Sequence, residues 1–117
     1  MVVEQAKLQI LKQLAIKPES SQRELAQALG ISLGSVNFCL KALVEKGCIK
    51  IQNFNNSSKK LSYAYLLTPQ GIKEKMQLTA HFLERKMQEY EALRTEIEVL
   101  RTEVEAAAER NGADAGF

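Results

Sequence analysis

The residues that could do chemistry in this chain lie within one stretch of small and polar side chains. If the stretch is helical, its polar residues share one face, with an asparagine and an aromatic ring at neighbouring positions. Asparagine can read adenine through two hydrogen bonds, phenylalanine can contact a thymine methyl group, and small residues let a backbone approach phosphates. We therefore predict that these residues enter or border the major groove of duplex DNA: Ser32, Gly34, Ser35, Asn37, Phe38 and Lys41. A helical hairpin with a solvated face would show the same pattern, so the prediction depends on the surrounding elements.

Two short helices joined by a turn would position this surface, within the segment QRELAQALGISLGSVNFCLKALVEKG. Ser21 has the side chain of an N-cap and Glu24 completes a capping box, so a helix is expected to start after Ser21. Gly30 ends that helix, Ser32 caps the next one, and Gly47 ends the second helix. This is the pattern of a DNA-reading helix-turn-helix.

Apolar spacing predicts how these helices pack. Leu25, Ala26 and Leu29 share one face of the first helix, and Ile31 would anchor the turn in the core. The second helix has an apolar stripe with two flanking residues: Val36, Leu40 and Leu43, with Cys39 and Val44 beside them. A helix over about residues 4–16 would complete a three-helix scaffold.

A change of period after Gly47 predicts a β-hairpin. Ile49, Ile51 and Phe54 form one apolar run, and residues 61–67 form another. The residues between them are of types that favour turns, and two lysines would make the tip of the hairpin basic. Three helices followed by a hairpin is the order of a winged helix, in which the hairpin lies along the DNA. The expected contacts to the DNA backbone are Arg23, Asn56, Ser58, Lys59 and Lys60; a solvated loop would also carry such residues.

The runs ELAQALGISLGSVNFCLKALVEKGCIKI and YLLTPQGIKEK, on either side of the predicted wing, resemble the MarR family of winged-helix transcription regulators. Within the family, the chain is similar to the exopolysaccharide-associated MarR-type regulators of bacteria in the segments SLGSVNFCLKALVEKG, IQNFNNS and YAYLLTPQGIKEKMQLTAHFLERK. The likeness covers roughly residues 5–105. The resemblance implies sequence-specific DNA binding as a homodimer and control of polysaccharide biosynthesis genes.

The chain also departs from the family pattern. Typical MarR wings carry an Asp and an Arg, whereas Asn56, Lys59 and Lys60 occupy that region here, so a wing arginine is not expected to read the minor groove. Ser35 stands where the closer relatives tend to have lysine. The chain has too few residues for the additional helices that build the MarR ligand pocket, so no small-molecule ligand is expected.

Charge is divided unevenly along the 117 residues, although the net charge is only +2. Residues 1–83 contain eleven Lys and Arg against five Asp and Glu, and residues 84–117 contain five against nine. The basic part is the part with the predicted helix-turn-helix and wing, as a DNA-binding protein requires.

The sequence lacks the residue patterns that other classes of function require. Cys39 and Cys48 lie in apolar patterns and are expected to be buried thiols, and with His81 they do not form a zinc site. No phosphate loop or nucleophile–base pair is present, so neither an enzyme nor a cofactor is expected. No apolar run reaches membrane-spanning length, and we expect a cytoplasmic protein associated with the bacterial nucleoid.

A long helix should follow the wing, because Thr68-Pro69 is a helix start and no breaker occurs before Asn111-Gly112 apart from Gly71. About 40 helical residues would extend roughly 60 Å, more than a small domain could cover. Residues 69–83 are expected to pack on the domain, assisted by Ile72, Met76 and Phe82. Residues 84–107 are expected to find another partner, although they could instead fold back on the domain.

Heptad spacing indicates that this partner is a second copy. Hydrophobic residues recur at positions a and d, with Met87 substituting for Lys86 at a break in the d series. The expected dimerisation residues are Leu83, Met87, Tyr90, Leu93, Ile97, Leu100 and Val104. In a parallel pair Glu89 and Glu96 would face Arg94 and Arg101 of the other copy, whereas an antiparallel pair would bring like charges together.

The predicted fold is mainly α with a small β-hairpin (α+β): a winged helix-turn-helix domain followed by a long C-terminal coiled-coil helix. We expect a DNA-binding domain over residues 1–75, a dimerisation helix over 76–110 and a disordered tail over 111–117. A parallel homodimer suits an inverted-repeat operator with half-sites about 10 base pairs apart. The alternative is a winged-helix adaptor that binds protein through the same face and has a coiled-coil stalk.

Overall fold

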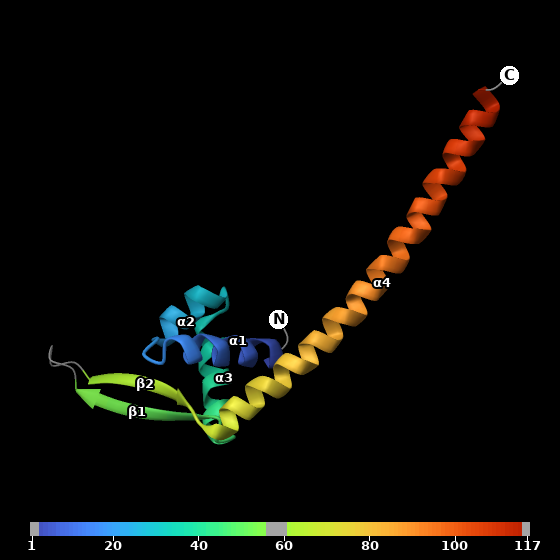
Figure 1. Ribbon diagram of the computed structural model, residues 1–117. Coiled ribbons are helices and arrows are strands. Elements are labelled where there is room, and N and C mark those ends of the chain that lie inside the picture. The colour runs from blue at the N-terminus through green and yellow to red at the C-terminus, as the bar shows by residue number, and fades with distance from the viewer. Residues whose placement is uncertain (1–2, 56–60, 116–117) are drawn as a thin grey trace. The chain divides into compact units, whose positions relative to one another are not determined.

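The computed structural model describes residues 3–55 and 61–115 of the protein. The chain contains helices α1 (Val3–Ile16), α2 (Gln22–Leu29) and α3 (Leu33–Glu45), strands β1 (Ile49–Asn55) and β2 (Leu61–Leu67), and helix α4 (Pro69–Ala115) (Figure 1). This order confirms the predicted α+β class, with three helices, a hairpin and a long final helix. The chain divides into two compact units, Met1–Phe82 and Leu83–Phe117.

Helices α1, α2 and α3 enclose the core of the first unit. Leu8, Leu11 and Leu14 of α1 are buried, together with Leu25 of α2. The inner face of α3 contributes Val36, Cys39, Leu40 and Leu43, as its spacing predicted. Ala26, Leu29, Ile31 and Val44 are partly buried against this cluster. The inner face of α3 is therefore packed against a continuous apolar core.

Local signals set the ends of α2 and α3. The Ser21 side chain accepts a hydrogen bond from the Glu24 amide at 3.1 Å, and the Glu24 carboxylate accepts one from the Ser21 amide at 3.3 Å. This is the predicted capping box. Gly30 has φ 66° and Gly47 has φ 78°, the left-handed conformation that favours glycine after a helix. The turn between the helices is thus determined by residues on both of its sides.

Strands β1 and β2 form the antiparallel hairpin that the sequence predicted, with a register from Ile49↔Leu67 to Asn55↔Leu61. Ile49 and Ala64 are buried, and the Tyr65 amide donates a hydrogen bond to the Pro18 carbonyl at 2.9 Å. That bond ties β2 to the loop after α1. The predicted tip contacts Asn56, Ser58, Lys59 and Lys60 lie outside the described residues.

The start of α4 is attached closely to the end of α3. Thr68 donates a side-chain hydrogen bond to the Gly47 carbonyl and a backbone hydrogen bond of 3.0 Å to the Cys48 carbonyl. Lys46 forms a 2.9 Å ion pair with Glu74. A Cβ atom on Gly71 would lie 2.0 Å from the Cys48 carbonyl oxygen, so only glycine permits this approach.

The first turns of α4 pack on the domain through residues other than those expected. Gly71 and Leu78 are buried and Phe82 packs against the core, whereas Ile72 and Met76 are 53% and 70% exposed. The prediction is confirmed for Phe82 and wrong for Ile72 and Met76. Because Gly71 brings α4 against the Cys48 carbonyl, the face with Leu78 and Phe82 points inward, and Ile72 lies about 100° around the helix from it.

In the second unit, residues 83–115 are helical and belong to α4. Helix α4 continues through Asn111 and Gly112 to Ala115, beyond the expected start of a tail at residue 111. One glycine costs a helix only about 1 kcal/mol relative to alanine, which is too little to end a helix by itself.

Candidate nucleic-acid interface

The outer face of α3 presents most of the predicted reading residues. Gly34, Ser35, Phe38 and Lys41 are exposed, and Phe38 has 61% of its surface accessible. The opposite face of the helix is buried in the core. Leu33, which sequence reasoning did not select, is also exposed at the first turn. The interface thus combines polar residues with two apolar side chains at the N-terminal half of α3.

Two serines organise the N-terminus of α3. The Ser32 side chain accepts a hydrogen bond from the Ser35 amide at 3.0 Å and donates one to the Ser35 hydroxyl at 2.9 Å. Ser32 is the predicted N-cap. The Ser35 hydroxyl accepts from Ser32 and keeps its own proton, which it can donate to a phosphate or a base. Ser32 and Ser35 therefore act as a hydrogen-bonded pair at the positive end of the helix dipole.

Asn37 lies at the edge of this face and is only partly exposed. Its side-chain amide donates a 3.2 Å hydrogen bond to the Gln22 side-chain carbonyl across the helix-turn-helix. Gln22 and Asn37 line a hollow of about 460 Å³ between α2, α3 and the hairpin, together with Leu40, Lys41, Val44, Glu45, Ile51 and Tyr65. The sequence did not reveal this contact, because it joins residues on different helices.

Cations flank the reading face. Arg23 on α2 and Lys41 on α3 are exposed, as their predicted role as DNA contacts requires. Lys50 on β1 is also exposed and was not selected from the sequence. Lys17 forms a 2.9 Å ion pair with Glu24, and the hydrogen bond to Glu24 raises the pKa of Lys17. Part of the positive charge near α2 is therefore already paired within the protein.

A second hollow of about 380 Å³ lies behind the N-terminus of α3. The residues that line it are Val3, Ala6, Ile31, Ser32, Gly34, Ser35, Phe38 and Cys39. Phe38 borders this hollow and remains largely exposed. Its ring is thus available for contact with a partner.

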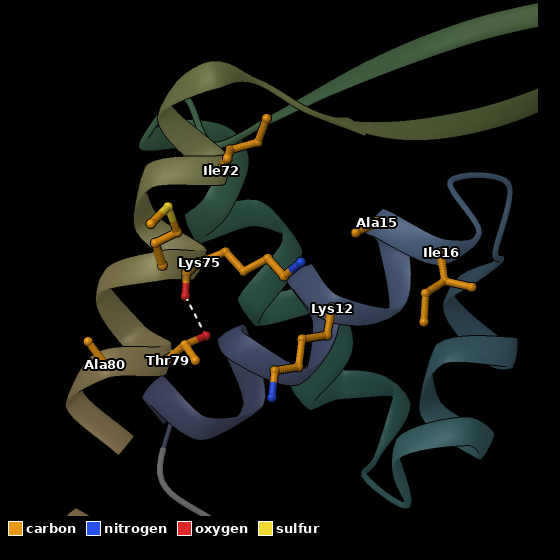
Figure 2. A pocket seen from close by; sticks show the side chains of 8 residues that line it. Lys12, Ala15, Ile16, Ile72, Lys75, Thr79 and Ala80 are labelled. Atoms are coloured by element: carbon orange, nitrogen blue, oxygen red, sulfur yellow. Dashed lines mark hydrogen bonds between the residues drawn. The ribbon is translucent and has the colours of Figure 1, made fainter. Parts of the chain in front are cut away.

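A larger groove of about 710 Å³ lies between α1 and the first turns of α4, as Figure 2 shows. Helix α1 contributes Lys12, Ala15 and Ile16, and α4 contributes Ile72, Lys75, Met76, Thr79 and Ala80. Ile16 is 80% exposed, and the Thr79 hydroxyl bonds to the Lys75 carbonyl at 2.7 Å rather than to another element. Sequence reasoning missed this groove because it assigned Ile72 and Met76 to the core.

The two cysteines are buried, whereas the histidine is exposed. Cys39 and Cys48 are free thiols, and burial raises the pKa of both. His81 lies 4.0 Å from the Glu4 carboxylate and meets Phe82 edge-on. Among the residues that the structure describes, no group of three or more His, Cys, Asp or Glu side chains could hold a metal ion.

The predicted dimerisation residues are exposed in the second unit, with accessible fractions between 44% and 68%. They are Leu83, Met87, Tyr90, Leu93, Ile97, Leu100 and Val104. Within this unit Arg94 lies 4.0 Å from Glu91, and Arg101 lies 3.8 Å from Glu98, each pair three residues apart on the helix. The pairs proposed across two copies stay a prediction.

No single helix among residues 3–55 and 61–115 has the length and apolar composition to span a membrane. Helices α2 and α3 reach that length and apolar composition only when they are taken together, as a pair bent by 113°.

Comparison with known proteins agrees with this geometry. Residues 4–50 match the family model described as winged helix-turn-helix DNA-binding. No curated protein matches the chain. The matched residues comprise α1, α2, α3 and the first residues of β1, so the fold and the exposed face of α3 define a winged helix-turn-helix domain.

Several solved structures share the fold. The MarR family transcription regulator SP03579 is 20% identical, with a TM-score of 0.58 over 95% of this chain and 72% of that chain. The putative transcriptional regulator TA0346 from Thermoplasma acidophilum is 25% identical, with a TM-score of 0.61 over 74% and 89%. A MarR/EmrR family regulator from Acinetobacter sp. ADP1 is 24% identical, with a TM-score of 0.55 over 85% and 74%. The resemblance to MarR-type winged helix-turn-helix regulators is thus confirmed, and the chain carries a domain with their fold.

Proposed function

We propose that this protein is a sequence-specific, DNA-binding transcription regulator that acts as a homodimer on an inverted-repeat operator. The observation that supports DNA binding most directly is the exposed N-terminal half of α3 within a matched winged helix-turn-helix domain. Ser32, Gly34, Ser35 and Lys41 would contact phosphates or base edges there, and Asn37 would read a base from the edge of the face. Phe38 would contact a thymine methyl group.

The charge distribution also supports DNA binding by the helix-turn-helix and the hairpin. Residues 1–83, which include the helix-turn-helix and hairpin, have a net charge of +6, and residues 84–117 have −4. Arg23, Lys59 and Lys60 would contact the DNA backbone, together with Asn56 and Ser58 at the wing tip. Such contacts release counterions and make binding salt-dependent. The acidic C-terminal helix would remain away from phosphates.

The exposed apolar residues of α4 support a parallel coiled-coil dimer. The same heptad frame that places Leu83 at position a, when counted back along the sequence, places Met76 at a and Ile72 and Thr79 at d. All three line the groove beside α1. A second copy of the helix would therefore cover apolar surface from Ile72 to Val104.

Cross-linking tests this arrangement, because both native thiols are buried. Tyr90→Cys and Met76→Cys should each form a disulfide between copies under mild oxidation, whereas Gln77→Cys, an exposed neighbour outside the a and d positions, should not. A chain in which neither Tyr90→Cys nor Met76→Cys cross-links is not a parallel dimer. If only Tyr90→Cys cross-links, the seam begins after the groove.

We further propose, from the resemblance to exopolysaccharide-associated regulators, that the genes controlled belong to polysaccharide biosynthesis. The protein would then act in the bacterial cytoplasm, on chromosomal DNA at the nucleoid. A genome-wide map of bound fragments tests this assignment directly, and enrichment at unrelated promoters would contradict it.

Binding to duplex DNA can be measured by fluorescence anisotropy at several salt concentrations. Asn37→Ala should relax sequence preference, and Lys60→Ala should weaken binding to all sequences alike and reduce the salt slope by about one. If both variants lose the same affinity on preferred and random duplexes, these roles are wrong.

A protein-binding adaptor is the second candidate, since Leu33 and Phe38 give the outer face of α3 exposed apolar surface. The same titration separates the two functions. A regulator binds random duplex in a salt-dependent manner, and an adaptor shows no such binding.

A further inference from the structure

A hydrogen bond from the Asn37 side chain to the Gln22 side chain joins α3 to α2, and it involves the residue best suited to read a base. Gln22 is the first residue of α2, directly after the Ser21 cap. The capping box therefore fixes the backbone from which the Gln22 side chain extends. Neither residue is fully exposed.

An asparagine amide has two N–H donors and one carbonyl acceptor. Reading adenine requires one donor, for N7, and the acceptor, for the N6 amino group. The bond to Gln22 uses one Asn37 donor at 3.2 Å, which leaves one donor and the acceptor. The unused groups are therefore the set that adenine needs.

We propose that Gln22 is a positioning residue that holds the Asn37 side chain in the conformation that reads adenine. This inference rests on the proposed DNA-binding function and assigns one part of its specificity to a residue outside the recognition helix. A side chain fixed before binding loses less conformational entropy when it meets its base. The benefit applies only to duplexes in which Asn37 makes its base contact, so Gln22 raises the preference for adenine rather than general affinity.

The experiment measures a ratio of dissociation constants. A preferred duplex is selected from a randomised pool with the wild-type protein, and the adenine that Asn37→Ala ceases to prefer is replaced by another base. The ratio of Kd values for the two duplexes is then measured for each variant. Because a partly unfolded sample changes both Kd values alike, the ratio separates positioning from a loss of stability.

Asn37→Ala should lower this ratio on the order of tenfold to a hundredfold. Gln22→Ala should lower it by about two- to tenfold, because the Asn37 side chain becomes free to rotate. Gln22→Glu keeps the acceptor and should preserve the ratio, while its charge weakens binding to every duplex. Gln27→Ala, an exposed glutamine on the same helix, is the matched control and should leave the ratio unchanged.

The outcomes separate the two hypotheses. If Asn37→Ala lowers the ratio and Gln22→Ala does not, the positioning role is wrong and the DNA-reading role stands. If Asn37→Ala leaves every base preference intact, Asn37 is not a reader and Gln22 has nothing to position. If the wild-type protein selects no duplex, the proposed function itself is wrong.

Discussion

Leucines occupy opposite environments in the two units of this protein. Leu11, Leu14 and Leu25 in the first unit have no accessible surface, whereas Leu93 and Leu100 in the second unit are 55% and 59% exposed. The first unit has an apolar core of its own. The second is a helix whose apolar residues have no comparable core, and helices are stabilised mainly by packing of an amphipathic face. The difference supports the proposal that the apolar residues of the second unit pack against a second copy of the chain.

The largest effect is expected from the core of the first unit. Leu11→Ala should lower the free energy of unfolding by about 2–5 kcal/mol, because it leaves a cavity between packed helices. Leu33→Ala makes the same chemical change at an exposed position and should change stability by less than about 0.5 kcal/mol. Urea denaturation measures both. Equal losses would mean that Leu33 is covered in solution.

Alanine at two glycines should act with opposite signs in the two units. Gly71→Ala places a Cβ 2.0 Å from the Cys48 carbonyl oxygen and should destabilise the first unit by about 1–3 kcal/mol. Gly112 has no atom within 4 Å of such a Cβ, so Gly112→Ala should stabilise the helix by about 0.5–1 kcal/mol. Denaturation midpoints and helical circular dichroism measure the two changes. The same sign at both positions would contradict the described junction.

A charge on the predicted seam should weaken association without unfolding the first unit. Val104→Asp, at position a, should raise the Kd of the dimer at least about tenfold, or roughly 1.4 kcal/mol, because the seam would bury an unpaired carboxylate. Val99→Asp is the matched control, since Val99 is exposed and lies outside the a and d positions. Sedimentation equilibrium measures both values. An equal effect of the two substitutions would exclude this register.

A smaller effect is expected at the cap of α2. Ser21→Ala removes the side-chain acceptor for the Glu24 amide and should cost about 1 kcal/mol of stability. Ser21→Asp retains an acceptor and should restore most of the loss. Thermal unfolding of the three proteins provides the comparison. A failure of aspartate to restore stability would show that the serine acts in another way.

The smallest effect should depend on pH. The hydrogen bond from Lys17 and the Ser21 backbone lower the pKa of Glu24 below its ordinary value. Its ionised form therefore stabilises the fold at neutral pH, and this contribution is lost as the pH falls through the lowered pKa. Glu24→Gln should be less stable than wild type at neutral pH and equal to it in acid, and Lys17→Gln should show the same profile. A difference that grows in acid would contradict this sign.

The sequence predicted the elements whose signals are local. Ser21 with Glu24, Gly30 and Gly47 determine helix ends through contacts within a few residues, so the boundaries of α2 and α3 followed from residue type. The alternation around Ile49 and residues 61–67 likewise predicted the hairpin. The outer face of α3 followed from its period of 3.6 residues.

Features that depend on three-dimensional contact did not follow from the pattern. The bond from Asn37 to Gln22 joins residues fifteen apart, and no periodicity identifies such a pair. Ile72 and Met76 have the residue types of a core but lie beside the face that Gly71 turns inward. The orientation of that face is set by one close backbone approach, which the hydrophobic pattern of α4 does not contain.

The junction between α3 and α4 has a mechanical consequence. Lys46, Gly47 and Cys48 are joined to Glu74 and Thr68 by an ion pair and two hydrogen bonds, and Gly71 closes the remaining space. Because these contacts connect the first turns of α4 to the end of α3, a rotation of one helix is expected to move the other with it. A partner that rotates the first turns of α4 would then change the orientation of α3.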